Sequence, residues 1–169
     1  MRRKIVAGNW KMHGSRAANA PLIEAIVAAT TDARATCVIC PPHVYLHDAW
    51  LLLRDGAVAL GAQDLCAESA GACTGEVSAV MLKDVGCTYT LVGHSERRTL
   101  FGESSALVAR KFAAALAGGL IPILCVGEQL AEREAGRTNE IVGTQLEAVL
   151  QLSGTPALGN AVIAYEPVW

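Results

Sequence analysis

The sequence predicts a parallel α/β fold in which short strands and longer helices alternate along a single domain, residues 1–169. Three observations predict it: strand-length runs that are apolar on both faces, helical periodicity between those runs, and a chain without linker or low-complexity tracts. We expect strands at residues 4–7, 37–40, 58–61, 88–92, 121–126 and 161–165. This alternation suits a doubly wound open sheet and a barrel equally, and periodicity alone does not separate them.

Two helices are predicted from apolar residues that recur at positions i, i+4, i+7 and i+8, which share one face of a helix. Ser78 is a suitable N-cap before the apolar run 79–82, and the glycine pair at 118–119 is a suitable helix stop. The two periodic sets are Val108, Phe112, Ala115 and Leu116, and Val142, Leu146, Val149 and Leu150.

Residues 64–77 break the alternation, because they form a long run of small residues without strand or helix periodicity. Loops of this length in compact domains are usually functional or disordered, and a mobile surface loop is the simplest interpretation.

Cys37 and Cys40 have the spacing of a redox or zinc pair, but they fall in a predicted strand. The strand period of two sends these positions to opposite faces of the sheet, and no second such pair follows. We therefore expect no metal site there. The six cysteines are expected to be reduced thiols, because the chain shows no secretion signal.

Charge and hydropathy exclude several classes of partner. A net charge of -2 and a pI near 6.1 give no basic surface for nucleic acid or an anionic membrane. The basic start at residues 1–4 is followed by only a short apolar run, unlike a signal peptide. The uncharged run 112–126 is interrupted by glycine and proline and is shorter than the roughly 18 residues of a spanning helix. We expect a cytoplasmic protein.

Polar and ionisable side chains collect where the predicted strands end. Asn9 and Lys11 follow the first strand, His94 and Ser95 follow the fourth, and Glu166 ends the sixth. The carboxyl ends of parallel strands lie on one side of the sheet, and that side carries the ligand site. We expect these five residues to share a pocket.

The residue types suggest a role for each side chain. Pro167 restricts Glu166 to extended backbone, which suits a rigidly held catalytic base. A helix beginning after His94 would disfavour a positive imidazole, so a neutral hydrogen-bond donor is expected. Asn9 and Lys11, two apart in an extended segment, would present an amide and an ammonium to an anionic substrate or oxyanion. Taken singly, each residue also has a purely structural interpretation.

Together these groups predict proton abstraction next to a carbonyl, in which a carboxylate removes a carbon-bound proton and the donors stabilise an enediolate oxygen. The sequence shows no metal-ligand cluster and no serine or cysteine nucleophile motif. Arg97 and Arg98 are expected to be ion-pair partners on the outside of the domain or at an interface.

Five motifs then resemble the triosephosphate isomerase family, in the order in which that family has them. They are AGNWKM at residues 7–12, GEVS at 75–78, VGHSERR at 92–98, CVGE at 125–128 and AYEPVW at 164–169. The resemblance implies a TIM (β/α)₈ barrel. It also implies an aldose–ketose isomerase of glycolysis and gluconeogenesis that interconverts dihydroxyacetone phosphate and D-glyceraldehyde 3-phosphate through an enediolate, with no cofactor and no metal.

The resemblance assigns roles to matching residues. It implies that Glu166 is the base, His94 the neutral electrophile, and Lys11 with Asn9 the catalytic, substrate-binding pair. The residues around these groups would be Ser95, Glu96 and Cys125. The loop 69–76 would dock onto a second subunit of a homodimer, with interface residues Thr74, Gly75 and Glu76.

A complete barrel of this class needs about 250 residues. We therefore expect this chain to supply the first six βα units, without the lid after Trp169 and strands seven and eight, and to have little activity alone. Two alternatives stay open: another phosphosugar isomerase or lyase on the same scaffold, and a catalytically inactive fragment or dimerising module if the chain really ends at Trp169.

Overall fold

The computed structural model describes residues 4–169 and contains one parallel sheet in which strands β1 to β6 lie in sequence order. A doubly wound sheet reverses its strand order part-way, whereas a barrel adds each strand beside the last. The strand order therefore identifies a barrel topology. The structure also confirms each predicted strand. They are β1 (Ile5–Asn9), β2 (Thr36–Cys40), β3 (Ala59–Ala62), β4 (Tyr89–Val92), β5 (Ile121–Val126) and β6 (Val162–Tyr165). Residues 1–3, which open the basic start, lie outside the described residues.

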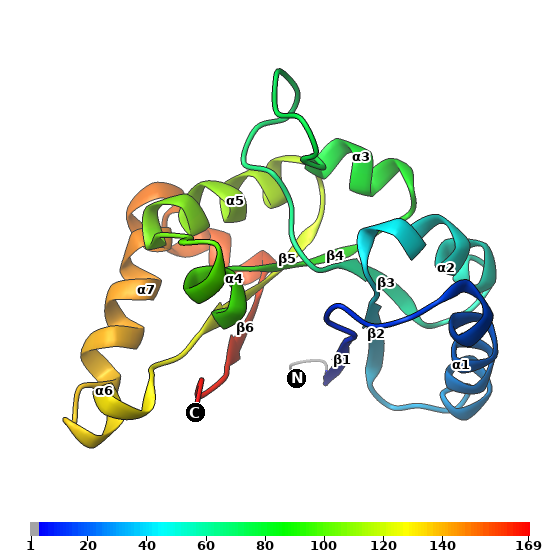
Figure 1. Cartoon of the computed structure of the whole chain (residues 1–169), viewed down its shortest axis with the longest axis horizontal. Helices are drawn as coiled ribbons and strands as arrows, with labels where there is room; N and C mark the ends of the chain where they lie inside the picture. The colour runs from blue at the N-terminus through cyan, green and yellow to red at the C-terminus, as the bar shows by residue number, and fades with distance from the viewer. Residues whose placement is uncertain (1–3) are drawn as a thin grey trace.

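The helices cover the outer face of an arched sheet, and the ends of β1 and β6 face the open side of the arch (Figure 1). They are α1 (Arg16–Ala29), α2 (Leu46–Leu53), α3 (Ala79–Asp84), α4 (Ser95–Leu100), α5 (Ser105–Ala117), α6 (Leu130–Glu134) and α7 (Thr138–Ser153), with short 3-10 helices at His43–Tyr45 and Thr155–Asn160. Both periodic sets fall on α5 and α7, as predicted. Within residues 4–169, no helix combines the length and apolarity that crossing a membrane requires.

Local signals set the helix ends. The Ser78 hydroxyl accepts a hydrogen bond from the Met81 N–H at 3.4 Å, which is the predicted N-cap of α3. Helix α5 ends at Gly118, the predicted stop. The amide of Gly118 bonds to the Ala114 carbonyl at 2.9 Å, so the last turn closes without a side-chain cap.

The core has two layers because strand side chains alternate between the faces of the sheet. The larger layer lies between sheet and helices and includes Phe112, Leu82 and Leu124, all fully buried. The smaller layer lines the inner face and includes Val38, Cys40, Tyr89, Leu91, Ile123 and Cys125. Cys37 packs on the helix side and Cys40 on the inner side, so the two thiols lie on opposite faces, as predicted.

A buried ionic cluster lies beneath the loop that follows β3. Lys111, on α5, places its Nζ 2.8 Å from both carboxylate oxygens of Asp64 and 2.5 Å from Glu103 Oε1. Arg97 contributes contacts of 2.9 Å to Asp64 and 2.6 Å to Glu103. Burial raises the pKa of Asp64. For Glu103 burial is outweighed by the hydrogen bonds from Lys111 and Arg97, which hold its pKa below the usual value. Arg97 is therefore an ion-pair partner, as predicted, but its side chain is only 28% exposed because both of its partners are buried.

Residues 64–77 form the predicted long loop, which projects from the arch at the top of Figure 1. Its base is closed where the Cys66 N–H donates to the Val77 carbonyl at 2.8 Å. A second bond, from the Glu76 N–H to the Cys73 carbonyl at 3.0 Å, tightens the tip. Gly75 has φ +89° at this turn, a conformation that favours glycine.

Candidate active site

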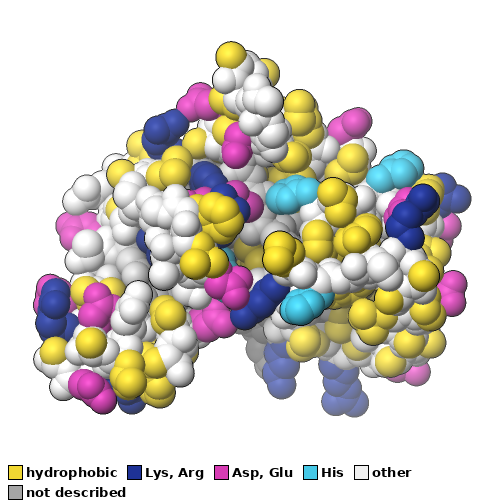
Figure 2. Space-filling model, in the orientation of Figure 1, with side chains coloured by type: hydrophobic (Ala, Val, Ile, Leu, Met, Phe, Trp, Pro, Cys, Tyr) yellow, Lys and Arg dark blue, Asp and Glu magenta, His cyan; other side chains and the backbone are white. Residues whose placement is uncertain are grey.

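The carboxyl ends of β1, β4 and β6 bring four predicted site residues into a continuous series of contacts. Lys11 Nζ lies 3.0 Å from Glu96 Oε1, and Glu96 Oε2 lies 3.6 Å from His94 Nδ1. On its other side, His94 Nε2 lies 3.3 Å from Glu166 Oε2. Figure 2 shows acidic, basic and histidine side chains together near the centre of this face. Side chains separated by up to 155 positions in the sequence therefore meet because parallel strands end on one side of the sheet.

His94 is the N-cap of α4 and is 7% exposed. Its Nδ1 accepts a hydrogen bond from the Glu96 backbone N–H at 3.3 Å. A ring nitrogen that accepts an N–H carries no proton, so the imidazole is neutral with its proton on Nε2. That N–H faces the Glu166 carboxylate. The geometry is that of a neutral donor, and its catalytic role stays a prediction.

The backbone of Lys11 is held in the left-handed region, with φ +51°, rather than in the extended conformation that we expected. The Asn9 side-chain oxygen accepts from the Lys11 N–H at 2.9 Å, and Gln63 Nε2 donates to the Lys11 and Cys40 carbonyls, both at 2.8 Å. The Glu96 carboxylate raises the pKa of the Lys11 ammonium by hydrogen bonding and charge. Asn9 and Lys11 nevertheless line one hollow, together with His94.

Gln63 was missed by the sequence reasoning. It follows β3 directly, so the rule that selected the other residues at strand ends would have found it.

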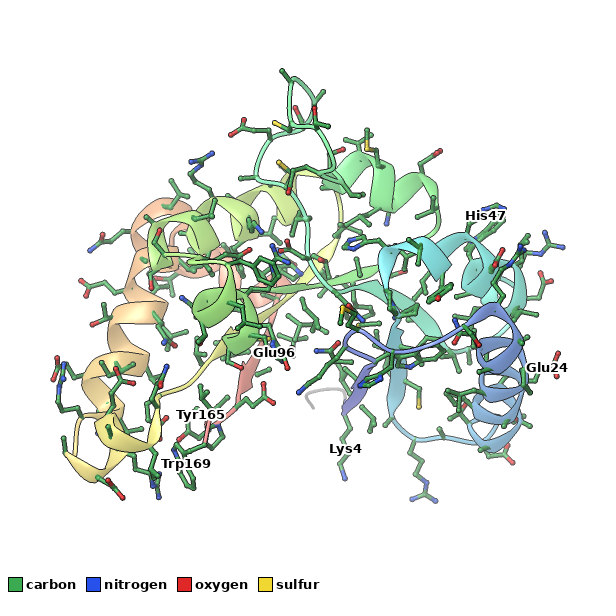
Figure 3. All side chains as sticks on the ribbon, viewed as in Figure 1. Lys4, Glu24, His47, Glu96, Tyr165 and Trp169 are labelled. Atoms are coloured by element: carbon green, nitrogen blue, oxygen red, sulfur yellow. The ribbon has the colours of Figure 1, made fainter. Side chains whose placement is uncertain are left out.

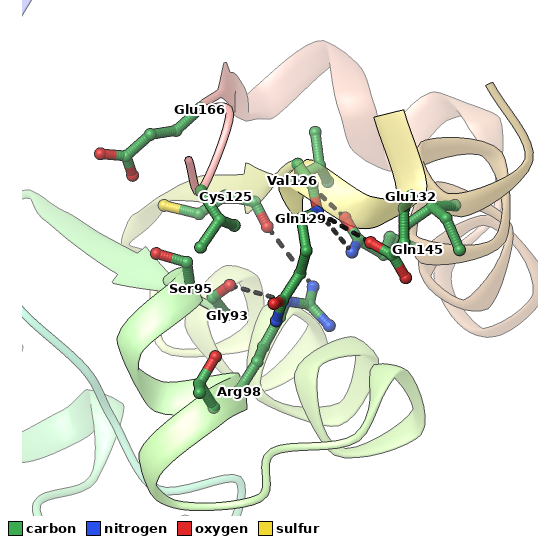
Figure 4. Close-up of a pocket in the computed structure, with 13 residues that line it drawn as sticks. Gly93, Ser95, Arg98, Cys125, Val126, Gln129, Glu132, Gln145 and Glu166 are labelled. Carbon is green, nitrogen blue, oxygen red and sulfur yellow. Dashed lines mark hydrogen bonds between the residues drawn. The ribbon is translucent and has the colours of Figure 1, made fainter. Parts of the chain in front are cut away.

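Glu166 opens onto a second, adjoining hollow of about 220 Å³ (Figure 4). Ser95 and Cys125 line it as well, which places both beside the predicted base. The Glu166 side chain is half-exposed, while its N–H donates to the Val126 carbonyl at 2.9 Å. Burial, aided by the Glu166 charge, raises the pKa of the Cys125 thiol to about 12, so this thiol stays protonated.

Arg98 lines this hollow, and among the described residues it contacts backbone carbonyls and a hydroxyl where an ion pair was expected. Its guanidinium donates to the Gly93 carbonyl at 2.8 Å, to the Cys125 carbonyl at 3.4 Å and to the Ser105 hydroxyl at 3.3 Å. Burial lowers its pKa from the usual value. Arg98 thus ties the ends of β4 and β5 together through their carbonyl oxygens.

A fully buried carboxylate, Glu128, supports the segment after β6 and was also missed. The Tyr165 hydroxyl lies 3.0 Å from both of its oxygens, and the Thr138 hydroxyl donates at 3.3 Å. Burial works to raise the pKa of Glu128, but the hydrogen bond from its own backbone N–H, together with those from neighbouring side chains, outweighs burial and lowers the pKa. Trp169 stacks under the Arg133 guanidinium at 4.8 Å, and Figure 3 shows it beside Tyr165. The CVGE motif contained Glu128, but its burial depends on residues ten or more positions away.

Metal-ligating side chains do not cluster in the described part of the chain: residues 4–169 contain no group of three or more His, Cys, Asp or Glu arranged to hold a metal ion. All six cysteines are free thiols.

Comparison with known proteins identifies the family. The model of the triosephosphate isomerase family matches residues 4–169. The chain belongs to the triosephosphate isomerase family. Relatives with that name include proteins from Cupriavidus taiwanensis, 57% identical, and Cupriavidus pinatubonensis, 58% identical, each over 100% of this chain and 68% of the relative. The Dechloromonas aromatica protein is 52% identical, with the same coverage.

The triosephosphate isomerase fold is confirmed by a solved structure. The crystal structure of triosephosphate isomerase from Bartonella henselae superposes with a TM-score of 0.92 at 39% identity, covering 99% of this chain and 69% of that one. The arch of six parallel strands is therefore part of a TIM barrel, as the resemblance implied. The four contacting residues lie at the carboxyl ends of its strands, where barrels of this fold carry their sites.

Proposed function

We propose that this chain carries the proton-transfer site of a triosephosphate isomerase, which interconverts dihydroxyacetone phosphate and D-glyceraldehyde 3-phosphate. Membership in the family supports the reaction. The observation that carries the site is the placement of a neutral imidazole N–H 3.3 Å from a carboxylate, between the ends of β4 and β6. A base and an electrophilic donor this close together can act on neighbouring atoms of a small substrate.

In the proposed reaction, the Glu166 carboxylate removes a proton from the carbon next to the carbonyl. The C–H electron pair forms the carbon–carbon double bond, and the carbonyl electrons move to oxygen to give an enediolate. The His94 Nε2–H and the Lys11 ammonium stabilise that oxygen, with Asn9 beside them. Glu166 then returns the proton to the former carbonyl carbon. At the same time the hydroxyl proton on the neighbouring carbon moves to the enediolate oxygen, which leaves a new carbonyl behind. One proton changes carbon and one changes oxygen within the substrate, with no net oxidation or reduction, so no cofactor or metal is needed.

The roles are matched to the surroundings of each group. A half-exposed Glu166 has room to reach a substrate, whereas the backbone bond of its N–H to Val126 fixes where the side chain begins. The Lys11 ammonium remains charged, because Glu96 raises its pKa. A fixed positive charge is what an anionic triose phosphate and its enediolate need.

A homodimer is part of the same proposal, with a cytoplasmic location. Large hydrophobic side chains lie exposed beside the hollow that contains Lys11: Met12 is 94% exposed, Leu100 72% and Phe101 66%. The loop tip at Thr74, Gly75 and Glu76 is also exposed. Contiguous apolar surface of this kind marks a protein interface, and the projecting loop of a second copy would cover it.

The catalytic proposal is tested by a coupled assay of triose phosphate interconversion. We expect Glu166→Asp to lower kcat roughly 100-fold with little change in KM, because moving a base by about 1 Å is enough for that effect. Glu24→Asp, on the exposed face of α1, is the matched control. An unchanged kcat in Glu166→Asp would remove this residue from the mechanism.

The dimer is tested by sedimentation at nanomolar concentration, where a fully active monomer would contradict it. A chain that dimerises without any turnover would instead support the alternative of a dimerising module. Turnover of a different phosphosugar, with none of triose phosphate, would support another isomerase or lyase.

A further inference from the structure

The backbone that carries Glu166 runs beside the segment that follows β5. The Glu166 N–H donates to the Val126 carbonyl at 2.9 Å, and the Val168 N–H donates to the Glu128 carbonyl at 3.1 Å, so parallel pairing continues past the end of β6. Gly127 lies between these two bonds. A Cβ built on Gly127 would lie 1.9 Å from the Glu166 carbonyl oxygen, and Cβ atoms do not approach within 3.0 Å. The Glu166 peptide therefore packs directly on Gly127.

Gly127 makes its own hydrogen bonds on the opposite edge of that segment. The carbonyls of Val126 and Glu128, on either side of Gly127, accept hydrogen bonds from the segment that follows β6. In a parallel ladder, the N–H and the carbonyl of the residue between them point to the opposite edge. On that side the neighbouring strand β4 has already ended, at Val92. The Gln145 carboxamide, on α7, takes the place of a strand neighbour: its Oε1 accepts from the Gly127 N–H at 2.9 Å, and its Nε2 donates to the Gly127 carbonyl at 3.0 Å (Figure 4).

We propose that Gln145 is a positioning residue for the base, acting through Gly127 on the backbone of Glu166. The inference rests on the proposed isomerase function, because it concerns the base of that reaction. One planar amide supplies both the donor and the acceptor that a peptide would supply. Gln145 and Glu166 both line one hollow, on opposite sides of it (Figure 4), and Gly127 connects the Gln145 carboxamide to the Glu166 backbone.

Removal of the carboxamide leaves two part-buried backbone groups without their partner. Gly127 is then no longer held against the Glu166 peptide. A displacement of the base by about 1 Å lowers turnover roughly 100-fold. We expect Gln145→Leu to lower kcat by roughly 10- to 100-fold with little change in KM, because Gln145 acts on the backbone of the base and does not line the hollow that contains Asn9 and Lys11.

The experiment compares steady-state kinetics of the wild-type protein, Gln145→Leu and Gln151→Leu. Gln151 lies on the same helix, is exposed, and donates to the Glu147 side chain, so its variant controls for the substitution itself. We expect Gln151→Leu to match the wild type. Equal kcat values for Gln145→Leu and Gln151→Leu would overturn the inference.

A third variant, Gln145→Glu, separates positioning from general destabilisation. A carboxylate lacks the N–H and repels the Gly127 carbonyl, but a protonated carboxyl donates and accepts as the amide does. The kcat of Gln145→Glu relative to wild type should therefore rise as the pH falls towards about 4.3, the usual carboxyl pKa. The kcat of Gln145→Leu relative to wild type should not change with pH. Parallel pH profiles of the two variants would contradict a positioning role.

Amide hydrogen exchange provides a readout that is independent of activity. The Glu166 N–H, bonded to the Val126 carbonyl, should exchange faster in Gln145→Leu than in wild type. Its exchange rate in Gln151→Leu should equal that of the wild type. Unchanged exchange at Glu166 would overturn the inference. A wild-type protein without turnover would instead favour the alternative of an inactive fragment over the proposed function, and the exchange data would still decide whether Gln145 orders this backbone.

Discussion

The Lys111→Met substitution should be among the most destabilising single changes in this fold. Lys111 is 4% exposed and holds two carboxylates that are themselves almost fully buried, Asp64 and Glu103. The cluster contains two cations and two anions, so its net charge is zero. Methionine fills similar space but leaves Arg97 as the one cation between two buried carboxylates.

The expected loss of stability is about 3–5 kcal/mol, the usual result of removing one partner from a buried ionic group. A domain of this size is stabilised by about 5–15 kcal/mol in total. Each kcal/mol corresponds to about 2–4 °C in the melting temperature at this chain length. The melting temperature of Lys111→Met should therefore fall by about 6–20 °C at pH 7, measured by calorimetry or circular dichroism.

The pH dependence gives the sharper test. In Lys111→Met, two buried carboxylates share one cation, so the folded protein binds a proton more tightly than the unfolded chain does, and the variant gains stability as the pH falls. In the wild type, the folded pKa of Glu103 is lowered, so its contribution is lost as the pH falls, whereas the folded pKa of Asp64 is raised, so its contribution changes in the opposite sense. The stability of the wild type therefore changes less with pH than that of the variant, and the difference in stability between the two proteins narrows between about pH 7 and 4.

Lys4→Met, at an exposed lysine labelled in Figure 3, is the matched control and should change stability by less than about 0.5 kcal/mol. The reasoning is refuted if Lys111→Met melts within the range of that control. A large loss that is constant from pH 4 to pH 8 would also refute the electrostatic explanation.

Three further predictions concern the site. Gln63→Leu removes the donor to the Lys11 carbonyl, so a loss of about 1–3 kcal/mol in urea unfolding is expected, and no loss would contradict a holding role. Tyr165→Phe should destabilise the protein more at pH 7 than well below about pH 4.3, because the Tyr165 hydroxyl bonds more strongly to an ionised carboxylate and the folded pKa of Glu128 is lowered. Cys125, with a pKa of about 12, should resist iodoacetamide at pH 8 until urea unfolds the chain, as read by peptide mass spectrometry.

The sequence was sufficient for every strand and for the helices with clear periodicity. Local signals such as Ser78 at the start of α3 act within a few residues, so they are visible without the fold. The position of His94 directly before a helix was likewise visible in the sequence. These successes share one cause: the interacting groups are near neighbours in the chain.

The contacts of Arg98 were not predicted, for the opposite reason. Arg98 lies on the short helix α4, but its side chain turns inward to the carbonyls of Gly93 and Cys125, and the second of these is 27 positions away. Gln145 gave no signal at all, because its role exists only where β4 ends before β5. Neither arrangement is visible until the strands are placed side by side.

The sequence by itself determined the alternation of strands and helices, the position of the site at the strand ends and the residue types available there. Hydrophobic period and capping chemistry are local, so they need no knowledge of the fold. Periodicity left a barrel and a doubly wound sheet equally possible; apart from the family resemblance of five motifs, only the tertiary structure distinguished them, because strand order depends on long-range pairing. It also decided that Lys111 meets Asp64, 47 positions away, and that His94 faces Glu166, since only packing brings such distant groups within bonding distance.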